Sequence, residues 1–262
     1  MQCALVAGGS KGIGFAIAEA LARRRYNLIL VGRDLNALDD AKMKLESAYQ
    51  VHVDTIVADL ALASSAKEIA DWCTEKNILL TMLCNVAGLG GPIDYLSLPV
   101  DKLRNMVELN VQSVIALCQA LLPLLEKNAP AYILNVSSMA GFAPIPVKNV
   151  YASTKAAIIF FSYSLRYQVK RKNISVSCLC PGPVFTKAGI EKDTADKAGW
   201  FGKKMAVNPK KVGEIAVRRT LNGRLIIVPG LLAKSMSVIL RVLPRRLIAL
   251  IYYKLGEKST GY

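Results

Sequence analysis

The chain has 262 residues, of which 53% are hydrophobic, and its formal net charge is +15 with a single histidine. This length fits one large domain with a substantial buried core. The lone histidine and six scattered cysteines give no metal-ligand spacing, so we expect reduced, buried cysteines, no metal centre and no histidine-based catalytic triad.

The first residues run directly into an apolar stretch that resembles a strand, without the charged and apolar segments of a secretory leader. No uninterrupted apolar run reaches the roughly 18 residues of a membrane span, so we expect a cytoplasmic protein. The positive charge is concentrated at one end: residues 197–262 hold 14 Lys and Arg against 2 Asp and Glu, a net +12, which leaves +3 for residues 1–196. A basic partner surface is therefore expected in the C-terminal quarter.

Apolar, β-branched runs alternate with helix-length segments along the chain. The runs are apolar throughout rather than at every second residue, which is typical of strands buried on both faces. The pattern predicts an α/β fold, a doubly wound Rossmann-type parallel sheet of seven strands with helices on both faces and a ligand at the carboxyl ends of the strands. Strands are expected at 2–7, 27–31, 52–57, 79–84, 131–136, 175–180 and 224–228, and helices at 13–25, 35–49, 62–76, 101–127, 150–172 and 209–221.

A glycine-rich turn, residues 8–14, follows the first strand and opens into a helix. Glycines at such a turn let backbone amides and the helix N-terminus approach a pyrophosphate. The spacing G-x-x-x-G-x-G differs from the commoner G-x-G-x-x-G. The prediction of a pyrophosphate-binding turn therefore depends on the position of these glycines between a strand and a helix. The expected cofactor contacts are Gly8, Ser10, Lys11, Gly12, Ile13 and Gly14.

The second strand ends at Gly32-Arg33, where folds that prefer NAD usually place an acid for the ribose 2′-hydroxyl. An arginine at this point accommodates the 2′-phosphate of NADP, and Lys11 adds a second cation. Both could be ordinary surface charges, and Asp34 follows closely. The balance favours NADP(H) over NAD.

Polar or glycine-containing breaks follow the later strands. The carboxyl ends of parallel strands meet at one edge of the sheet, so these breaks are expected to line the ligand site, although each alone could be ordinary turn chemistry. They are Asp59 and Leu60 after the third strand, Asn85, Ala87 and Gly88 after the fourth, Ser137 and Ser138 after the fifth, and Pro181, Gly182, Val184 and Thr186 after the sixth.

Tyr151 and Lys155 lie four residues apart in a predicted helix, so their side chains point the same way. A nearby ammonium favours the ionised form of a phenol and brings its pKa of about 10 closer to neutral. Ser138 adds a hydroxyl that could hold a carbonyl oxygen against that phenol. Such a pair also arises by chance in most chains of this length, so its weight depends on the other motifs.

Taken together in their order along the chain, these motifs resemble those of the short-chain dehydrogenase/reductase family over about residues 2–230. The resemblance is to the NADP-preferring type of that family. The family's T-G-x-x-x-G-I-G matches residues 7–14, its N-N-A-G residues 85–88, its Y-x-x-x-K residues 151–155 and its P-G-x-x-x-T residues 181–186. The family's catalytic serine and helix asparagine match Ser138 and Asn110. Ala7 replaces the usual threonine and Val86 the second asparagine, from which we expect a local packing change and not lost activity.

The resemblance implies an NADPH-dependent oxidoreductase that reduces a carbonyl of a lipophilic substrate to an alcohol, and a homodimer or homotetramer. Tyr151 would donate a proton to the carbonyl oxygen and Ser138 would hydrogen-bond it. Lys155 would lower the pKa of Tyr151 and bind the nicotinamide ribose, Asn110 would hold a water of the proton relay, and Thr186 would contact the carboxamide. A nucleotide-sensing or membrane scaffold that keeps the fold without chemistry is the alternative.

We assign residues 1–230 to a catalytic dinucleotide-binding domain with a substrate lid near 185–205, and residues 231–262 to a basic, apolar helical extension. The lid combines Phe185, Trp200 and Phe201 with five lysines. Such a mixture suits a lipophilic ketone, such as a steroid-like or a 3-oxoacyl compound. The 3-oxoacyl compounds include thioesters of a phosphate-bearing carrier. A mobile lid with merely solvated lysines would have the same composition.

The extension contains two apolar segments, 236–243 and 247–253, separated by Arg241, Pro244, Arg245 and Arg246. Neither segment is long enough to span a bilayer, and Pro244 should break a helix there. A basic, apolar helical hairpin over 231–255 could lie in an anionic membrane surface, or pack on the substrate cleft or a second subunit. Nucleic acid is not expected, because the charges are interleaved with aliphatic residues and no binding module is present.

Overall fold

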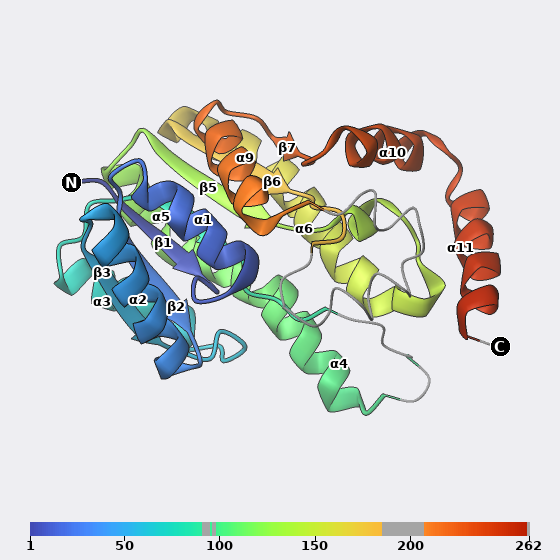
Figure 1. The fold of residues 1–262 in the computed structure, drawn as a ribbon, viewed down its shortest axis with the longest axis horizontal. Coiled ribbons are helices and arrows are strands. Elements are labelled where there is room, and N and C mark those ends of the chain that lie inside the picture. The colour runs from blue at the N-terminus through green and yellow to red at the C-terminus, as the bar shows by residue number, and fades with distance from the viewer. Residues whose placement is uncertain (91–94, 96–97, 185–206, 261–262) are drawn as a thin grey trace.

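The computed structural model describes residues 1–90, 95, 98–184 and 207–260. Within them the strands form one parallel sheet in the order β3-β2-β1-β4-β5-β6-β7, which confirms the predicted fold class. The chain starts in the middle of the sheet, builds outward to β3, and then returns to build the other half from β4 (Figure 1). The strands are β1 (Cys3–Ala7), β2 (Asn27–Gly32), β3 (Val53–Val57), β4 (Leu80–Asn85), β5 (Ala131–Val136), β6 (Ile174–Leu179) and β7 (Ile226–Ile227).

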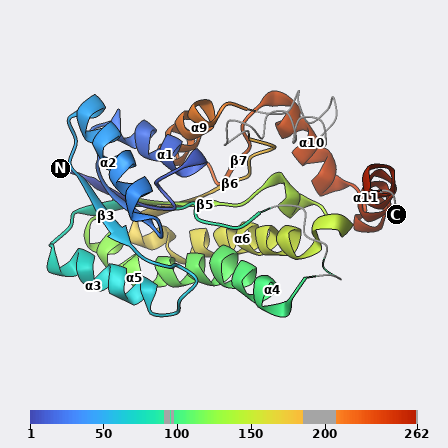
Figure 2. The same ribbon diagram turned by 60° about the horizontal axis from the view of Figure 1, so that its bottom comes forward.

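Helices cover both faces of the sheet (Figure 2). On one face lie α1 (Gly12–Ala22), α2 (Leu35–Tyr49) and α9 (Pro209–Leu221), and on the other α3 (Ser65–Glu75), α4 (Val100–Val107), α5 (Ser113–Lys127) and α6 (Asn149–Gln168). Each face has its own apolar core. Cys3, Leu5 and Ala7 of β1 enter one core, whereas Ala4 and Val6 enter the other. Because both sides of the strand are buried, its sequence is continuously apolar.

The predicted helix at 101–127 is a continuous helical run, Val100–Lys127, in which a π-helical turn, η1 (Glu108–Gln112), joins α4 to α5. By length and composition this run could cross a membrane, with a mean hydropathy of 1.4 over its most apolar window. The expectation that no segment is long and apolar enough was wrong in this respect. In the fold α5 packs against α3, β4 and β5, and Leu117, Leu121 and Leu125 are buried there.

The C-terminal residues form two helices, α10 (Leu231–Val242) and α11 (Arg245–Thr260), separated at Leu243 and Pro244 as predicted. They lie at the end of the molecule beyond α6 (Figures 1 and 2). Ala233, Leu240 and Ile248 from these helices are buried in the core that α5 and α6 share. The contacts of the two helices fall on η2 (Met139–Phe142) and η3 (Pro146–Lys148), the short turns between β5 and α6.

Candidate active site

The glycine turn after β1 requires glycine at three positions. Gly8 and Gly12 have φ angles of +85° and +58°, in the left-handed region that favours glycine. A Cβ on Gly14 would lie 1.9 Å from the carbonyl oxygen of Gly8. The first turn of α1 has no side-chain cap and contains no acidic residue. The turn therefore presents backbone N–H groups and the positive end of the α1 dipole at the carboxyl edge of the sheet.

The two departures from the family motif, Ala7 and Val86, meet where β1 borders β4. The carbonyl oxygen of Ala7 accepts hydrogen bonds from the backbone N–H groups of Val86 at 2.9 Å and Ala87 at 2.8 Å. The Val86 side chain packs on the core beneath α1 and α9. Backbone bonds and apolar packing thus hold the strand and the loop together here.

Asn110 lies in the π-helical turn and is fully buried. Its Oδ1 accepts from the N–H of Leu89 at 2.7 Å, and its Nδ2 donates to the carbonyl of Leu89 at 2.9 Å and to Oγ1 of Thr154 at 3.1 Å. The hydroxyl of Thr154 donates to the carbonyl of Tyr151 at 2.7 Å. One amide therefore joins the loop after β4 to the helical turn that carries Tyr151. Thr154 and Leu89 were not among the predicted site residues, since neither belongs to a motif.

Ser138, Tyr151 and Lys155 come together at the end of β5 and the start of α6. Nζ of Lys155 lies 5.9 Å from the centroid of the Tyr151 ring and donates to the carbonyl of Val136 at 3.2 Å. Ser138 is close enough to Tyr151 to lower the pKa of the phenol, and its Oγ accepts from the N–H of Ala140 at 3.1 Å. The predicted constellation of a hydroxyl, a phenol and an ammonium is therefore present as a cluster.

Gly88 fits between two members of this cluster. A Cβ there would lie 3.0 Å from Oδ1 of Asn110 and 3.2 Å from Nζ of Lys155. Gly90 lies beside the ring of Tyr151, with a Cβ expected 3.4 Å from Cε2. The loop after β4 thus passes close to the side chains of Asn110, Tyr151 and Lys155, and Gly90 is a site residue that the motif alone did not reveal.

Burial controls the titration of the phenol and the ammonium. It raises the pKa of Tyr151, while the hydrogen bond with Ser138 acts in the opposite direction. Burial also lowers the pKa of Lys155 to about 8, against the influence of Cys178 and Cys180. The expectation that Lys155 would depress the pKa of Tyr151 is not met in this geometry. The ammonium lies over the ring and bonds the Val136 carbonyl, so desolvation dominates at the phenol.

The cations predicted to select NADP are exposed at the end of β2 and in the glycine turn. Nζ of Lys11 lies 2.7 Å from a carboxylate oxygen of Asp34, and Nη1 of Arg33 lies 3.7 Å from one of Asp59. Each cation therefore already faces a carboxylate. A Cβ on Gly32 would lie 3.7 Å from Oγ of Ser10, which places the glycine turn beside the end of β2.

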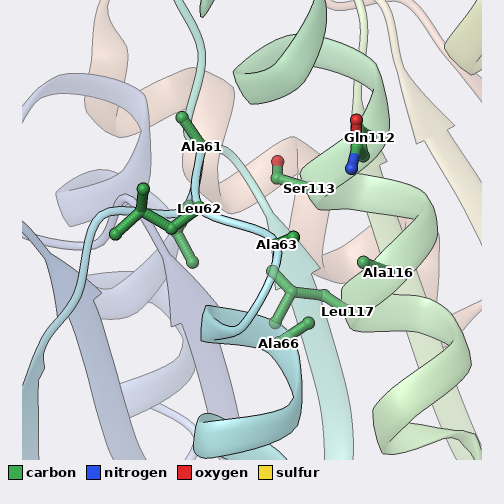
Figure 3. Close-up of a pocket in the computed structure, with 9 residues that line it drawn as sticks. Ala61, Leu62, Ala63, Ala66, Gln112, Ser113, Ala116 and Leu117 are labelled. Carbon is green, nitrogen blue, oxygen red and sulfur yellow. The ribbon is translucent and has the colours of Figure 1, made fainter.

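Leu60 borders a small pocket between the loop after β3 and α5 (Figure 3). Its free volume of about 10 Å³ is close to that of one water-sized probe. Alanines and leucines from both sides surround it, and its polar side chains, Gln112 and Ser113, come from the helical run alone. No sequence motif indicated this pocket. The residues that line it are Leu60, Ala61, Leu62, Ala63, Ala66, Gln112, Ser113, Ala116 and Leu117.

The remaining predicted residues have different environments. The side chain of Asn85 is buried and donates from Nδ2 to Oδ1 of Asn135 at 2.8 Å and to Sγ of Cys118 at 3.3 Å, so it serves the core. Pro181 follows β6, and its carbonyl accepts from the N–H of Met139 at 3.0 Å. Gly182 and Val184 continue that loop. Thr186 and the whole of the predicted lid at 185–205 lie outside the described residues.

A doubly wound parallel sheet with a glycine turn after its first strand places the chain in the Rossmann-type α/β class. The chain belongs to the short chain dehydrogenase family, whose model matches residues 2–197. This confirms the resemblance drawn from the motifs.

Several known proteins are similar to the chain. "Very-long-chain 3-oxoacyl-CoA reductase-A" of Danio rerio is 35% identical over 202 residues, which cover 74% of this chain and 62% of that protein. The chain thus matches less than two thirds of the length of this relative. A solved structure from a study of 7beta-hydroxysteroid dehydrogenase stereoselectivity shares the fold, with a TM-score of 0.86 at 19% identity and 96% of both chains covered. A short-chain dehydrogenase from Sphingobium yanoikuyae in complex with NADPH has a TM-score of 0.78 at 25% identity, covering 99% of this chain and 96% of that one.

Lys155 provides a stability test in the ligand-free protein. Because its pKa falls from 10.5 to about 8 on folding, the unfolded chain binds this proton between those pH values and the native state does not. The contribution of Lys155 to stability therefore rises with pH across that range. We expect Lys155→Met to increase the free energy of unfolding, relative to the unsubstituted protein, by about 3 kcal/mol more at pH 7 than at pH 10. Urea unfolding at both pH values measures this difference.

The exposed Lys170→Met serves as the matched control, and its effect should be the same at both pH values. Taking differences between variants removes the contribution of the buried cysteines, which titrate in the same range. An equal effect of Lys155→Met at the two pH values would contradict the lowered pKa.

Proposed function

We propose that the protein is an NADPH-dependent reductase that converts a carbonyl of a lipophilic substrate, with a 3-oxoacyl thioester as the first candidate, into an alcohol. The observation that carries the proposal is the cluster of Ser138, Tyr151 and Lys155 beside the glycine loop at residues 88–90. The name of the Danio rerio relative supports the 3-oxoacyl class. Steroid-like and other ketones or aldehydes remain candidates, because the residues predicted to form the lid lie outside the described ones.

The rim residues fit NADP(H). Gly8 and Gly12 adopt the left-handed backbone of a tight turn, and Gly14 packs against the carbonyl of Gly8, so the turn lies close against the α1 N-terminus, whose free N–H groups suit a pyrophosphate. Arg33 and Lys11 offer cations for a 2′-phosphate, and the NADPH complex of the Sphingobium yanoikuyae enzyme supports this choice. When bound, the reduced nicotinamide supplies the hydride. The residues proposed to hold the cofactor are Gly8, Ser10, Lys11, Gly12, Ile13, Gly14, Arg33, Asp59, Leu60, Asn85, Ala87, Gly88, Tyr151, Lys155, Pro181, Gly182, Val184 and Thr186, with Asn85 acting through its backbone.

The raised pKa of Tyr151 suits the reductive direction. A phenol that stays protonated at neutral pH is available to donate its proton to a carbonyl oxygen as negative charge develops there. Ser138, which lies beside Tyr151, is placed to hydrogen-bond the same oxygen. Lys155 retains donors beyond its bond to Val136 and is proposed to bind the ribose and restore the proton on Tyr151. Asn110 fixes the loop and the helical turn, and its proposed water contact would use its backbone, since its amide is fully bonded.

We expect Tyr151→Phe to abolish reduction, because the substitution removes the proton donor while keeping the ring. Turnover with NADPH should fall by at least about 100-fold, the lower range of general acid catalysis. The measurement is NADPH absorbance with a panel of 3-oxoacyl-CoA esters, steroid ketones and aldehydes. NADPH binding by fluorescence is the control and should remain. Full activity of the variant would exclude this mechanism, and no turnover by the unsubstituted protein would instead favour a nucleotide-sensing or scaffold role.

We expect Arg33→Asp to shift cofactor preference from NADPH toward NADH. Losing a charge-assisted contact to the 2′-phosphate costs about 1.5–3 kcal/mol, so the KM for NADPH should rise by about 10- to 100-fold. Initial-rate kinetics with both cofactors measure the shift. Lys11→Met is the companion variant, because Lys11 is the other candidate cation. If Arg33→Asp leaves the preference for NADPH over NADH unchanged while Lys11→Met shifts it toward NADH, then Lys11 in the glycine turn selects the cofactor and Arg33 does not.

We also propose that α10 and α11 attach the enzyme to an anionic membrane surface. Exposed apolar side chains on α10, including Leu231, Val238 and Val242, recur at helical spacing, with Leu231 86% and Val242 78% exposed. Residues 231–255 contain Lys and Arg but no Asp or Glu, so the charge complements anionic lipid. An apolar stripe edged with cations is typical of helices that lie in the headgroup layer.

Exposed Phe160 and Tyr167 on α6 support the expected homo-oligomer.

A double substitution tests membrane binding better than truncation at residue 230, which would uncover core contacts of Ala233, Leu240 and Ile248. We expect the full chain to float with vesicles of phosphatidylglycerol and phosphatidylcholine and less with phosphatidylcholine alone. Val238→Ser combined with Val242→Ser should reduce flotation several-fold, since each removes apolar area. Val100→Ser, exposed on α4, is the control. Equal flotation of all three proteins, or none, would refute the proposal.

A further inference from the structure

Two arginines of the C-terminal helices contact one phenylalanine near the site. Cζ of Arg241 lies 5.1 Å from the centroid of the Phe142 ring, and Nη1 of Arg245 donates a hydrogen bond to the carbonyl oxygen of Phe142. Phe142 itself is 4% exposed. Its ring and its backbone are thus held from two successive helices. We name Arg241, Arg245 and Phe142 the arginine clamp.

The clamp is rigid on the arginine side. Nε of Arg241 donates to the carbonyl of Ser237 at 2.9 Å, and its Nη2 contacts Oγ of Ser237 at 3.1 Å. Ser237 is fully buried. Arg245 is the first residue of α11, next to Pro244, whose carbonyl accepts from the N–H of Ile248, a buried core residue. Both guanidinium groups are therefore directed by helices that are anchored in the core.

On its other side, the turn that ends at Phe142 begins at Ser138 and packs against the backbone of Lys155. Ser138 caps this turn by accepting from the N–H of Ala140. A Cβ on Gly141 would lie 2.8 Å from the carbonyl carbon and oxygen of Lys155, so the turn directly abuts α6. The hydroxyl of Ser137 donates to the same carbonyl of Lys155 at 2.6 Å. A displacement of Phe142 would thus be passed to Ser138 and to Lys155.

We propose that Arg241 and Arg245 are positioning residues that hold the 137–142 turn, and through it Ser138 and Lys155, in the geometry required for reduction. The inference rests on the proposed function and deepens it, since it makes α10 and α11 part of the catalytic apparatus. Neither arginine contacts the reacting atoms; both act through Phe142. Arg241 contacts the ring of Phe142 and Arg245 its carbonyl oxygen, so substituting either arginine removes a different interaction.

The test compares Arg245→Met, which removes the hydrogen bond, with Arg245→Lys, which retains a donor of similar reach, and with Arg241→Met. Arg246→Met on the same helix is the matched control, because Arg246 is exposed and does not belong to the clamp. With the best substrate of the carbonyl panel, kcat should fall by about 10- to 100-fold in both methionine variants, while KM and NADPH affinity change by less than about twofold. Arg245→Lys should recover most of the loss, and Arg246→Met should match the unsubstituted protein.

A second readout needs no substrate and keeps this inference separate from the proposed function. Ultraviolet titration of the phenol, taken as the difference between each protein with and without Tyr151→Phe, reports how strongly Ser138 lowers the pKa of Tyr151. Loss of the clamp should weaken this effect of Ser138 and raise the apparent pKa of Tyr151 in Arg245→Met and Arg241→Met, but not in Arg246→Met. Unchanged kcat and unchanged titration in both variants would overturn the inference. If the unsubstituted protein reduces no carbonyl, the titration alone decides it, and an unmoved pKa again overturns it. Equal losses in kcat, NADPH affinity and thermal stability would reduce the arginines to a structural role.

Discussion

The burial of one ammonium group is the constraint on which the site depends. Nζ of Lys155 belongs to a residue that is only 5% exposed, and a buried charge is costly unless hydrogen bonds replace its water. The carbonyl of Val136 supplies one such bond. Gly88 must lack a side chain for the ammonium to fit, and the backbone of Lys155 must stay in contact with Ser137 and Gly141. The loops after β4 and β5 are therefore fixed by the same residue that the proposed chemistry needs.

This constraint explains why the site is assembled from loops and not from one element. The sheet brings the carboxyl ends of β4 and β5 side by side, and α6 crosses directly beyond them. The π-helical turn supplies the third support, because it directs the amide of Asn110 at both Leu89 and Thr154. Every polar group of that amide is used within the protein, so Asn110 orders the loop before any ligand binds. The site is pre-organised by backbone contacts.

Much of the fold was predictable because its cause is local. A strand buried on both faces needs apolar residues at every position, and β1 shows this by sending alternate residues to two cores. One edge strand was the exception: residues 224–228 were predicted, but β7 contains only Ile226 and Ile227, which pair with Cys178 and Leu179 of β6. The positions of Tyr151 and Lys155 on one helix face also follow from the sequence, because helical spacing determines them.

The remaining features depend on contacts between distant segments, which spacing does not encode. The bond of Arg245 to Phe142 joins residues far apart in the chain, and the pairing of Asn85 with Asn135 depends on the register of β4 and β5. The upward shift in the pKa of Tyr151 could likewise not be predicted from the sequence. A neighbouring cation was visible in the motif, but the degree of burial, which outweighs it, arises only when the loops close around the ring.

In the C-terminal helices, some features follow from helical spacing and others from contacts with distant segments. On α10, Ala233, Ser237 and Leu240 recur at helical spacing and are buried, whereas Val238 and Val242 are exposed on the opposite side. The inward side carries the contacts to the catalytic turn, and the outward side carries the apolar residues proposed to meet lipid. Val238 and Val242 do not belong to the clamp, so their insertion into lipid would leave the contact of Arg241 with the ring of Phe142 in place.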